Sequence, residues 1–248
     1  MKVIEGKSLS FRYSQKEAYL LEGVSFTVHE GEILTILGDN ATGKSTLLSM
    51  ISTLLRGGEG EVLYYGKPLA DWDLKELRGK IGYVPQEVSL YPSRSLLENF
   101  LFFAGLYGMK GKERKGRVMD VIQSLDLEEE KDKPVRKLSG GMKRRGNLGA
   151  GLLHEPQILI LDEPTVGIDF SSRGKILQTL KELQKTGMTV VQATHSLEEV
   201  RYLGGEVSIL ENRRLKSLGN IDKDQVAWFN EYETMGGLVS AWLKKEEE

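Results

Sequence analysis

The stretch "ILTILGDNATGKST" (33–46) decides the fold of this chain. Residues 33–37 form a nearly continuous apolar run, which is typical of a strand buried on both faces. The residues that follow match the pattern G-x-x-x-x-G-K-S/T, and "GKSTLLSMISTLL" (43–55) has the spacing of a helix. A strand, a glycine-rich loop and a helix in this order predict a phosphate-binding loop.

Each residue type in this loop suits a polyphosphate. Glycine at the first position allows the tight turn, and the following backbone amides can curl around a β-phosphate at the positive end of the helix. Lys44 is expected to reach the β- and γ-phosphates, and the Ser45 hydroxyl to bind Mg²⁺. A chance match is the alternative, and the strand–loop–helix context argues against it. The expected phosphate-binding residues are Gly38, Asn40, Ala41, Thr42, Gly43, Lys44, Ser45 and Thr46.

Two carboxylates follow a second apolar run, in "ILILDEPT" (158–165). Ligands of open α/β sheets bind outside the carboxyl ends of the strands. Asp162 is therefore a candidate Mg²⁺ ligand, and Glu163 is a candidate to orient or deprotonate an attacking water. An Asp-Glu pair alone more often begins a solvated loop, but its occurrence together with a phosphate loop in the same chain favours the functional interpretation.

A histidine ends a third strand-like run, in "TVVQATHSLEEV" (189–200). A neutral imidazole at this position of His195 could contact the γ-phosphate or the water, although a lone histidine at a helix start is usually structural. Ser196 and Glu199 predict a capping box for the next helix.

Gln86 lies just past the apolar strand in "IGYVPQEVSL" (81–90), ahead of a helical region. A glutamine there could touch both Mg²⁺ and the attacking water, and could report the nucleotide state to the helices that follow.

The rest of the chain alternates between strand and helix patterns. Strands alternating with helices predict an α/β fold with a largely parallel sheet. The segments with clear patterns are a hairpin at 60–69, a helical insertion at about 88–155, strands at 157–162 and 188–195, a closing hairpin at 206–219 and one or two amphipathic helices at 224–248.

Length and composition narrow the classes of function. A chain of 248 residues suits one large domain, or one core with an inserted subdomain. A net charge of −2 gives no basic footprint, so we expect no nucleic-acid partner. The absence of cysteine excludes disulfides and thiol catalysis. The longest apolar stretch, 100–109, is about half of a membrane span, and no signal peptide is evident. A membrane role therefore needs a partner.

A second anion-binding pattern stands in "KLSGGMKRRG" (137–146). A hydroxyl and two glycines at a helix start suit a phosphate. The alternative is a glycine-rich helix start without a ligand. The basic cluster 143–145 predicts a partly solvated helix face that also supports this helix.

In their order along the chain, "GDNATGKST", Gln86, "LSGGM", "ILILDEP" and His195 resemble the nucleotide-binding domain of an ABC ATPase, over about residues 2 to 220. The resemblance implies a P-loop NTPase fold with a mostly parallel core sheet, an antiparallel β subdomain and an inserted helical subdomain, followed by a tail at 221–248. It also implies ATP and Mg²⁺ as cofactors.

The resemblance answers why one chain carries two phosphate-binding patterns. In this family two subunits pack head to tail, so a second copy or a paralogue is the implied partner. Each presents its signature to the γ-phosphate held by the other, which implies roles for Ser139, Gly140, Gly141 and Met142. Tyr13 matches the aromatic residue that stacks on adenine, and Asp169 matches a carboxylate that crosses the dimer interface. The alternatives are a core tyrosine and a helix N-cap.

This chain departs from the family pattern at Asp39, Ala41 and Thr42, where Pro, Gly and Ala are common. Asp39 is tolerable only if its carboxylate points away from the phosphates, and Ala41 only if its φ is negative. Met142 replaces the usual signature glutamine.

"SGGMKRR" is similar to the signature of type-2 ABC exporter ATPases. That similarity implies an ATPase on the cytoplasmic face of a membrane, powering export through a separate integral membrane permease. Residues 89–100 are the expected docking surface. The alternative is a soluble ABC-type ATPase of cofactor assembly or DNA repair.

Overall fold

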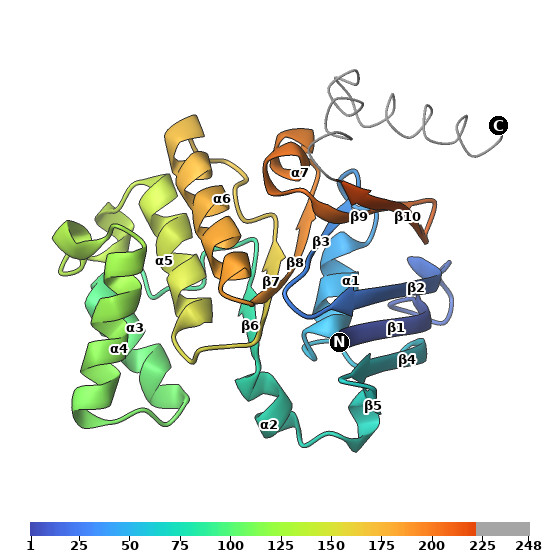
Figure 1. The fold of residues 1–248 in the computed structure, drawn as a ribbon, viewed down its shortest axis with the longest axis horizontal. Helices are drawn as coiled ribbons and strands as arrows, with labels where there is room; N and C mark the ends of the chain where they lie inside the picture. Colours follow the sequence, from blue (N-terminus) through green and yellow to red (C-terminus); the bar gives the residue numbers. More distant parts are fainter. Residues whose placement is uncertain (222–248) are drawn as a thin grey trace.

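The computed structural model describes residues 1–221, and the helices predicted at 224–248 lie outside this range. Figure 1 shows an antiparallel sheet on one side, a group of helices on the other, and parallel strands between them. Within the described range the antiparallel sheet has the strand order β2-β1-β4-β5. Its strands are β1 (Lys2–Phe11), β2 (Leu21–His29), β4 (Glu59–Tyr64) and β5 (Lys67–Pro68). The hairpin predicted at 60–69 is confirmed as β4 and β5.

The second sheet has the order β10-β9-β3-β8-β7-β6 in the described part of the chain. All neighbours in it are parallel except β10, which runs antiparallel to β9. Its strands are β3 (Ile33–Leu37), β6 (Ile81–Val84), β7 (Ile158–Asp162), β8 (Thr189–Thr194), β9 (Gly205–Glu211) and β10 (Arg214–Ile221). The predicted mostly parallel core sheet and closing hairpin are confirmed.

The central strands of this sheet are buried on both faces. Every residue of β3, β7 and β8 is buried. Along β7, Leu159 and Leu161 belong to one apolar core while Ile158 and Ile160 belong to another, as the two-residue period of a strand requires. The carboxyl ends of β3, β7 and β8 therefore meet at one well-supported edge.

Helix α1 (Lys44–Ile51) follows the phosphate loop and packs into the second of these cores. It ends before residue 55, where the sequence pattern predicts its end, because Thr53 adopts φ 67°. A residue in the left-handed region commonly ends a helix. The short helix α2 (Leu74–Gly79) precedes β6.

Three helices occupy the segment in which a helical insertion is expected: α3 (Leu96–Leu106), α4 (Gly111–Ser124) and α5 (Gly140–Leu152). Leu96, Phe100 and Ala104 line one face of α3 and are buried in the first core. The helix begins with a capping box between Ser95 and Glu98.

Two further helices cover the sheet, α6 (Phe170–Lys185) and α7 (Leu197–Leu203). The capping box predicted for α7 is wrong. Ser196 is the N-cap, but its side chain makes no capping hydrogen bond. Glu199 is instead turned into the interior, where it accepts a hydrogen bond from Thr165 in the loop after β7. No helix within residues 1–221 is both long and apolar enough to cross a membrane.

Candidate functional site

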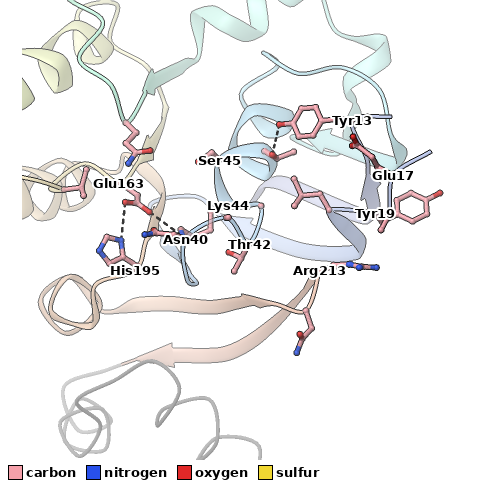
Figure 2. Close-up of a pocket in the computed structure, with 18 residues that line it drawn as sticks. Tyr13, Glu17, Tyr19, Asn40, Thr42, Lys44, Ser45, Glu163, His195 and Arg213 are labelled. Carbon is pink, nitrogen blue, oxygen red and sulfur yellow. Dashed lines mark hydrogen bonds and ion pairs between the residues drawn. The ribbon is translucent and has the colours of Figure 1, made fainter. Parts of the chain in front are cut away.

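A cavity of about 840 Å³ opens at the carboxyl edge of the parallel sheet. Figure 2 shows Glu163 and His195 at one end, Tyr13 and Tyr19 at the other, and Lys44 and Ser45 between them. Most residues that the sequence predicts for nucleotide binding line this cavity: Tyr13, Asn40, Ala41, Thr42, Gly43, Lys44, Ser45, Thr46, Gln86, Glu163 and His195.

Further lining residues come from segments without a recognisable motif: Glu17, Ala18, Tyr19, Leu20, Val166, Asn212 and Arg213. Asn212 and Arg213 form the turn between β9 and β10, and both adopt positive φ. The Arg213 carbonyl accepts a hydrogen bond from the Glu22 amide, which holds the turn against the start of β2. The pairing of β9 with β3 and the contact with β2 bring this turn to the cavity, so a local motif does not indicate its role.

The phosphate loop wraps around its own lysine. Lys44 is 5% exposed, and its Nζ donates hydrogen bonds to the carbonyls of Gly38 and Asp39, each at 2.8 Å. Gly43 adopts φ 103°, a backbone conformation that glycine tolerates best. These two contacts hold the Lys44 ammonium at the cavity, where it can bind an anion in place of the carbonyls.

Ala41 lies in the left-handed region at φ 63°, so the condition of a negative φ that an alanine sets at this position is not met. The loop needs this conformation for its curl, which Thr42 closes by donating its hydroxyl to the Asp39 carbonyl at 3.0 Å. An alanine there costs about 1–2 kcal/mol that a glycine would not. The Asp39 side chain is exposed and does not line the cavity, in keeping with the requirement that it point away from bound phosphates.

Asp162 ends β7, and its side chain is buried beside the loop. Burial raises the pKa of this carboxyl, and a hydrogen bond from Ser45 acts in the opposite direction. The Oδ1 atom is buried and has no hydrogen-bond partner among the described residues. A buried carboxylate oxygen without a partner is costly unless another group binds it.

Glu163 is held between two basic side chains. Its Oε1 lies 3.4 Å from Lys44 Nζ, and its Oε2 lies 3.2 Å from His195 Nδ1. The side chain is nearly buried, whereas His195 is about half exposed. Glu163 also adopts φ 44°, a conformation that non-glycine residues keep only where the surrounding structure holds them. The strand β8 ends at Thr194, one residue earlier than predicted, so His195 directly follows the strand.

Tyr13 is 68% exposed, so the alternative of a core tyrosine is wrong. It follows β1 and packs its ring edge-on against Phe11. Its hydroxyl shares a hydrogen bond of 3.0 Å with Thr46 Oγ1, at the first turn of α1. An exposed aromatic ring beside the phosphate loop offers a stacking surface.

The signature residues do not line the same cavity as the phosphate loop. Ser139 is the N-cap of α5 and accepts a hydrogen bond from the Met142 amide at 3.2 Å. Ser139 and Gly140 are exposed, and Gly140 lines a separate cavity of about 470 Å³. Gly141 is buried against Ser172 of α6. The helix start therefore presents its free groups outward, away from the phosphate loop of its own chain.

Asp169 caps helix α6. Its Oδ1 accepts the Ser172 amide hydrogen at 2.9 Å, and this bond holds the pKa of the carboxyl below its usual range. The N-cap alternative is confirmed, and the exposed position leaves the carboxylate accessible to a second chain.

Gly141→Ala is expected to destabilise the fold by about 1–3 kcal/mol. A Cβ at this position would lie 1.9 Å from Ser172 Oγ and 2.3 Å from Ser172 Cβ. Thermal unfolding measures the loss, and adding Ser172→Gly should recover part of it. The matched control is Gly116→Ala, where a Cβ meets nothing within 4 Å. That exposed helix position should gain about 0.5–1 kcal/mol. Equal effects at the two glycines would contradict the packing account.

Comparisons with known proteins agree with this geometry. The model of the family described as ABC transporter matches residues 21–166. The linearmycin resistance ATP-binding protein LnrL of Bacillus subtilis (strain 168) is 39% identical over 217 residues, 88% of this chain and 69% of that protein. The Nod factor export ATP-binding protein I of Burkholderia orbicola (strain AU 1054) is 34% identical over 211 residues, 85% of this chain and 68% of that protein.

Among solved structures, a similar one is the dimeric ATP-binding cassette MJ0796 in a post-hydrolysis state bound to ADP and Pi. It superposes with a TM-score of 0.77 at 30% sequence identity, covering 87% of this chain and 98% of that one.

Proposed function

This chain belongs to the ABC transporter family, and from that membership we propose how its residues bind ATP, hydrolyse it and couple hydrolysis to transport. It is an ATP-hydrolysing subunit. One observation carries the assignment of roles. Lys44 and His195 both contact Glu163 at the cavity of the phosphate loop, and the adjacent Asp162, which interacts with Ser45 and Lys44, has a buried oxygen without a partner among residues 1–221.

ATP binding begins with an exchange of partners at the loop. The Lys44 ammonium leaves the carbonyls of Gly38 and Asp39 and the Glu163 carboxylate, and binds the β- and γ-phosphates instead. Charge-assisted bonds to phosphate are stronger than the neutral contacts they replace. The loop amides and the Thr46 hydroxyl bind the remaining oxygens at the start of α1. The adenine ring stacks on exposed Tyr13.

The residues present fit Mg²⁺. Asp162 supplies a buried carboxylate oxygen that has no partner in the described part of the chain, and the Ser45 hydroxyl lies next to this carboxylate. Mg²⁺ in nucleotide sites is usually held by one or two protein oxygens together with phosphates and water. Asp162, Ser45 and Gln86 would hold the ion, which supplies charge neutralisation on the β- and γ-phosphates.

Glu163 is the general base for the attacking water. When Lys44 binds the phosphates, the Oε1 atom of Glu163 becomes free to accept the proton of the water. His195 stays beside Oε2 and orients the carboxylate, and its exposed edge faces the γ-phosphate. The unusual φ of Glu163 fits this role, since strained backbone is concentrated at functional sites.

The signature helix serves a second copy of this chain. Ser139 and Gly140 are exposed and lie outside the cavity of their own phosphate loop. In a head-to-tail dimer they complete the site of the partner, so both chains close on two shared ATP molecules. Asp169 lies beside the signature and faces the same interface.

Residues 89–100 and the neighbouring face of α3 bind a membrane permease, and the relatives suggest export. Tyr91 is 50% exposed and packs against the rings of Phe102 and Phe103, which makes an aromatic surface on the helical insertion. Aromatic residues are enriched in the centres of protein interfaces. We infer that the ATPase works on the cytoplasmic face of the membrane.

Purification of the tagged chain from its native membranes in mild detergent tests the transport role. We expect an integral membrane protein to co-purify and to stimulate hydrolysis. The double variant Tyr91→Ser/Phe102→Ser should lose this partner and keep ATP binding. Co-purification of a soluble partner alone, in every detergent, would overturn the transporter assignment and leave the ATPase.

A further inference from the structure

Arg144 of α5 makes two contacts that the basic character of its segment does not predict. One guanidinium nitrogen, Nη1, donates to the Gln86 carbonyl, and Nη2 donates to the Val166 carbonyl at 3.3 Å. The first carbonyl belongs to the loop after β6 and the second to the loop after β7. One side chain therefore joins the signature helix to both catalytic loops.

The contact with Val166 leads directly to Glu163. The Val166 amide donates to the Glu163 carbonyl at 3.3 Å, which closes the turn that contains both residues. Glu163 adopts φ 44°, and such a conformation persists only where neighbouring groups hold it. This turn holds one side of the residue, and a 3.0 Å hydrogen bond from the Glu163 amide to the Ala193 carbonyl holds the other. The carbonyl end of the turn is held by Arg144.

The two residues whose carbonyls bind Arg144 also separate two cavities. Gln86 and Val166 line both the 840 Å³ cavity of the phosphate loop and the 470 Å³ cavity beside Gly140. Arg144 lines only the second of these. Arg144 thus lies on the signature side of these two residues, and the cavity of the phosphate loop lies on their other side.

Electrostatics agrees with this placement. Burial lowers the pKa of Arg144, and the negative charge of Glu163 acts in the opposite direction. An arginine remains protonated in proteins, so its fork of donors is permanent. Its planar geometry suits two carbonyls at once, which a lysine ammonium cannot match in the same way.

We propose that Arg144 is a positioning residue for hydrolysis. It holds Glu163 and Gln86 in a fixed position relative to the signature helix. This inference rests on the proposed catalytic role of Glu163. When the signature helix moves to meet the partner's ATP, Arg144 carries that movement to the base and to Gln86 of its own site. Occupancy of one site thereby affects the chemistry at the other.

The neighbouring arginine has a different role. Arg145 is buried and donates to the carbonyls of Leu125 and Asp126, both within the helical insertion. It supports the packing of the insertion, whereas Arg144 connects the insertion to the core. Lys143 and Arg144 are partly exposed, so the prediction that 143–145 form a partly solvated face is confirmed for these two residues and wrong for the buried Arg145.

Steady-state kinetics of Arg144→Met tests the proposal, because methionine keeps much of the apolar stem and removes the donors. We expect kcat to fall on the order of tenfold while KM for ATP changes by less than about twofold. Arg144→Lys should recover part of the loss. Lys143→Met, one residue away on the same helix, is the control and should keep the wild-type kcat. Thermal melts of each variant report any loss of folding separately.

A double variant identifies the route of the effect. In the Glu163→Gln background, Arg144→Met should reduce the residual rate by less than about twofold, because both changes act on the same step. A full tenfold loss in that background would overturn the proposed route through Glu163, and an unchanged kcat in Arg144→Met alone would overturn the proposal itself. Loss of turnover in Glu163→Gln checks the proposed function independently of either result.

Discussion

Glu163→Gln is expected to lower ATP turnover by roughly 10²- to 10⁴-fold, the usual contribution of a positioned general base. An amide has nearly the same shape as the carboxylate but cannot accept the water's proton. The substitution also removes the negative charge that lies 3.4 Å from Lys44 Nζ. ATP affinity should therefore be kept or increased, and the ATP-bound dimer should accumulate. Single-turnover hydrolysis and size-exclusion chromatography with MgATP measure both effects.

The control for this variant is Glu199→Gln. Glu199 is also a buried glutamate near the site, but it faces Thr165 and does not line the cavity. Its replacement should change turnover by no more than a few fold. Full hydrolysis by Glu163→Gln would remove the general base from the mechanism. A monomer at saturating MgATP would count against the composite site.

Asp162→Asn is expected to change activity and stability in opposite directions. Turnover should fall on the order of 10²-fold or more, because the carboxylate that fits Mg²⁺ is lost. The nucleotide-free protein should gain about 1 kcal/mol, or roughly 2–4 °C in melting temperature, because a buried charge with an unpartnered oxygen is removed. Melting curves without nucleotide or metal, together with MgATP turnover, measure the two effects.

The pH dependence of Asp162→Asn has a definite sign. Burial raises the pKa of Asp162 in the folded state above its unfolded value, so folding favours the protonated form. The wild type therefore gains stability from this group as the pH falls through the folded-state pKa, and Asn lacks that gain. The difference in melting temperature between variant and wild type should shrink as the pH falls.

Asp126→Asn is the matched control. Asp126 is an exposed carboxylate paired with Lys175 at 3.0 Å, so its replacement should change the melting temperature little. A wild type more stable than Asp162→Asn at neutral pH would show that Asp162 Oδ1 has a stabilising partner, and would contradict its interpretation as a free ligand position.

The parts of the site that sequence could predict are those set by local pattern. The run into the phosphate loop and the carboxylate at the end of β7 depend on residues adjacent in the chain, and both were expected. Ala41 shows where this fails, because the curl of the loop overrides the preference of alanine. Glu199 shows a second failure, since burial against Thr165 outweighs a local capping box.

Contacts between distant segments carried no local signal. The packing of Gly141 on Ser172 and the reach of Arg144 to Gln86 and Val166 depend on how the helical insertion docks on the core. The sequence shows glycine and arginine at these positions but not what they face. A resemblance, rather than periodicity, singled out Tyr13; the residue lines the cavity, and its role in stacking on adenine stays a prediction.

The central claim is that each ATP site combines the phosphate loop of one chain with the signature of another, and mixing two inactive variants tests it most directly. A dimer of two Lys44→Ala chains has a broken phosphate loop in both of its sites. A dimer of two Ser139→Glu chains has a carboxylate against the γ-phosphate in both of its sites. In a mixed dimer, the intact loop of one chain meets the intact signature of the other. Random pairing leaves one site in four with both parts intact, so we expect recovery of up to about a quarter of the wild-type rate per chain. A mixture no more active than its separate components would contradict the shared site.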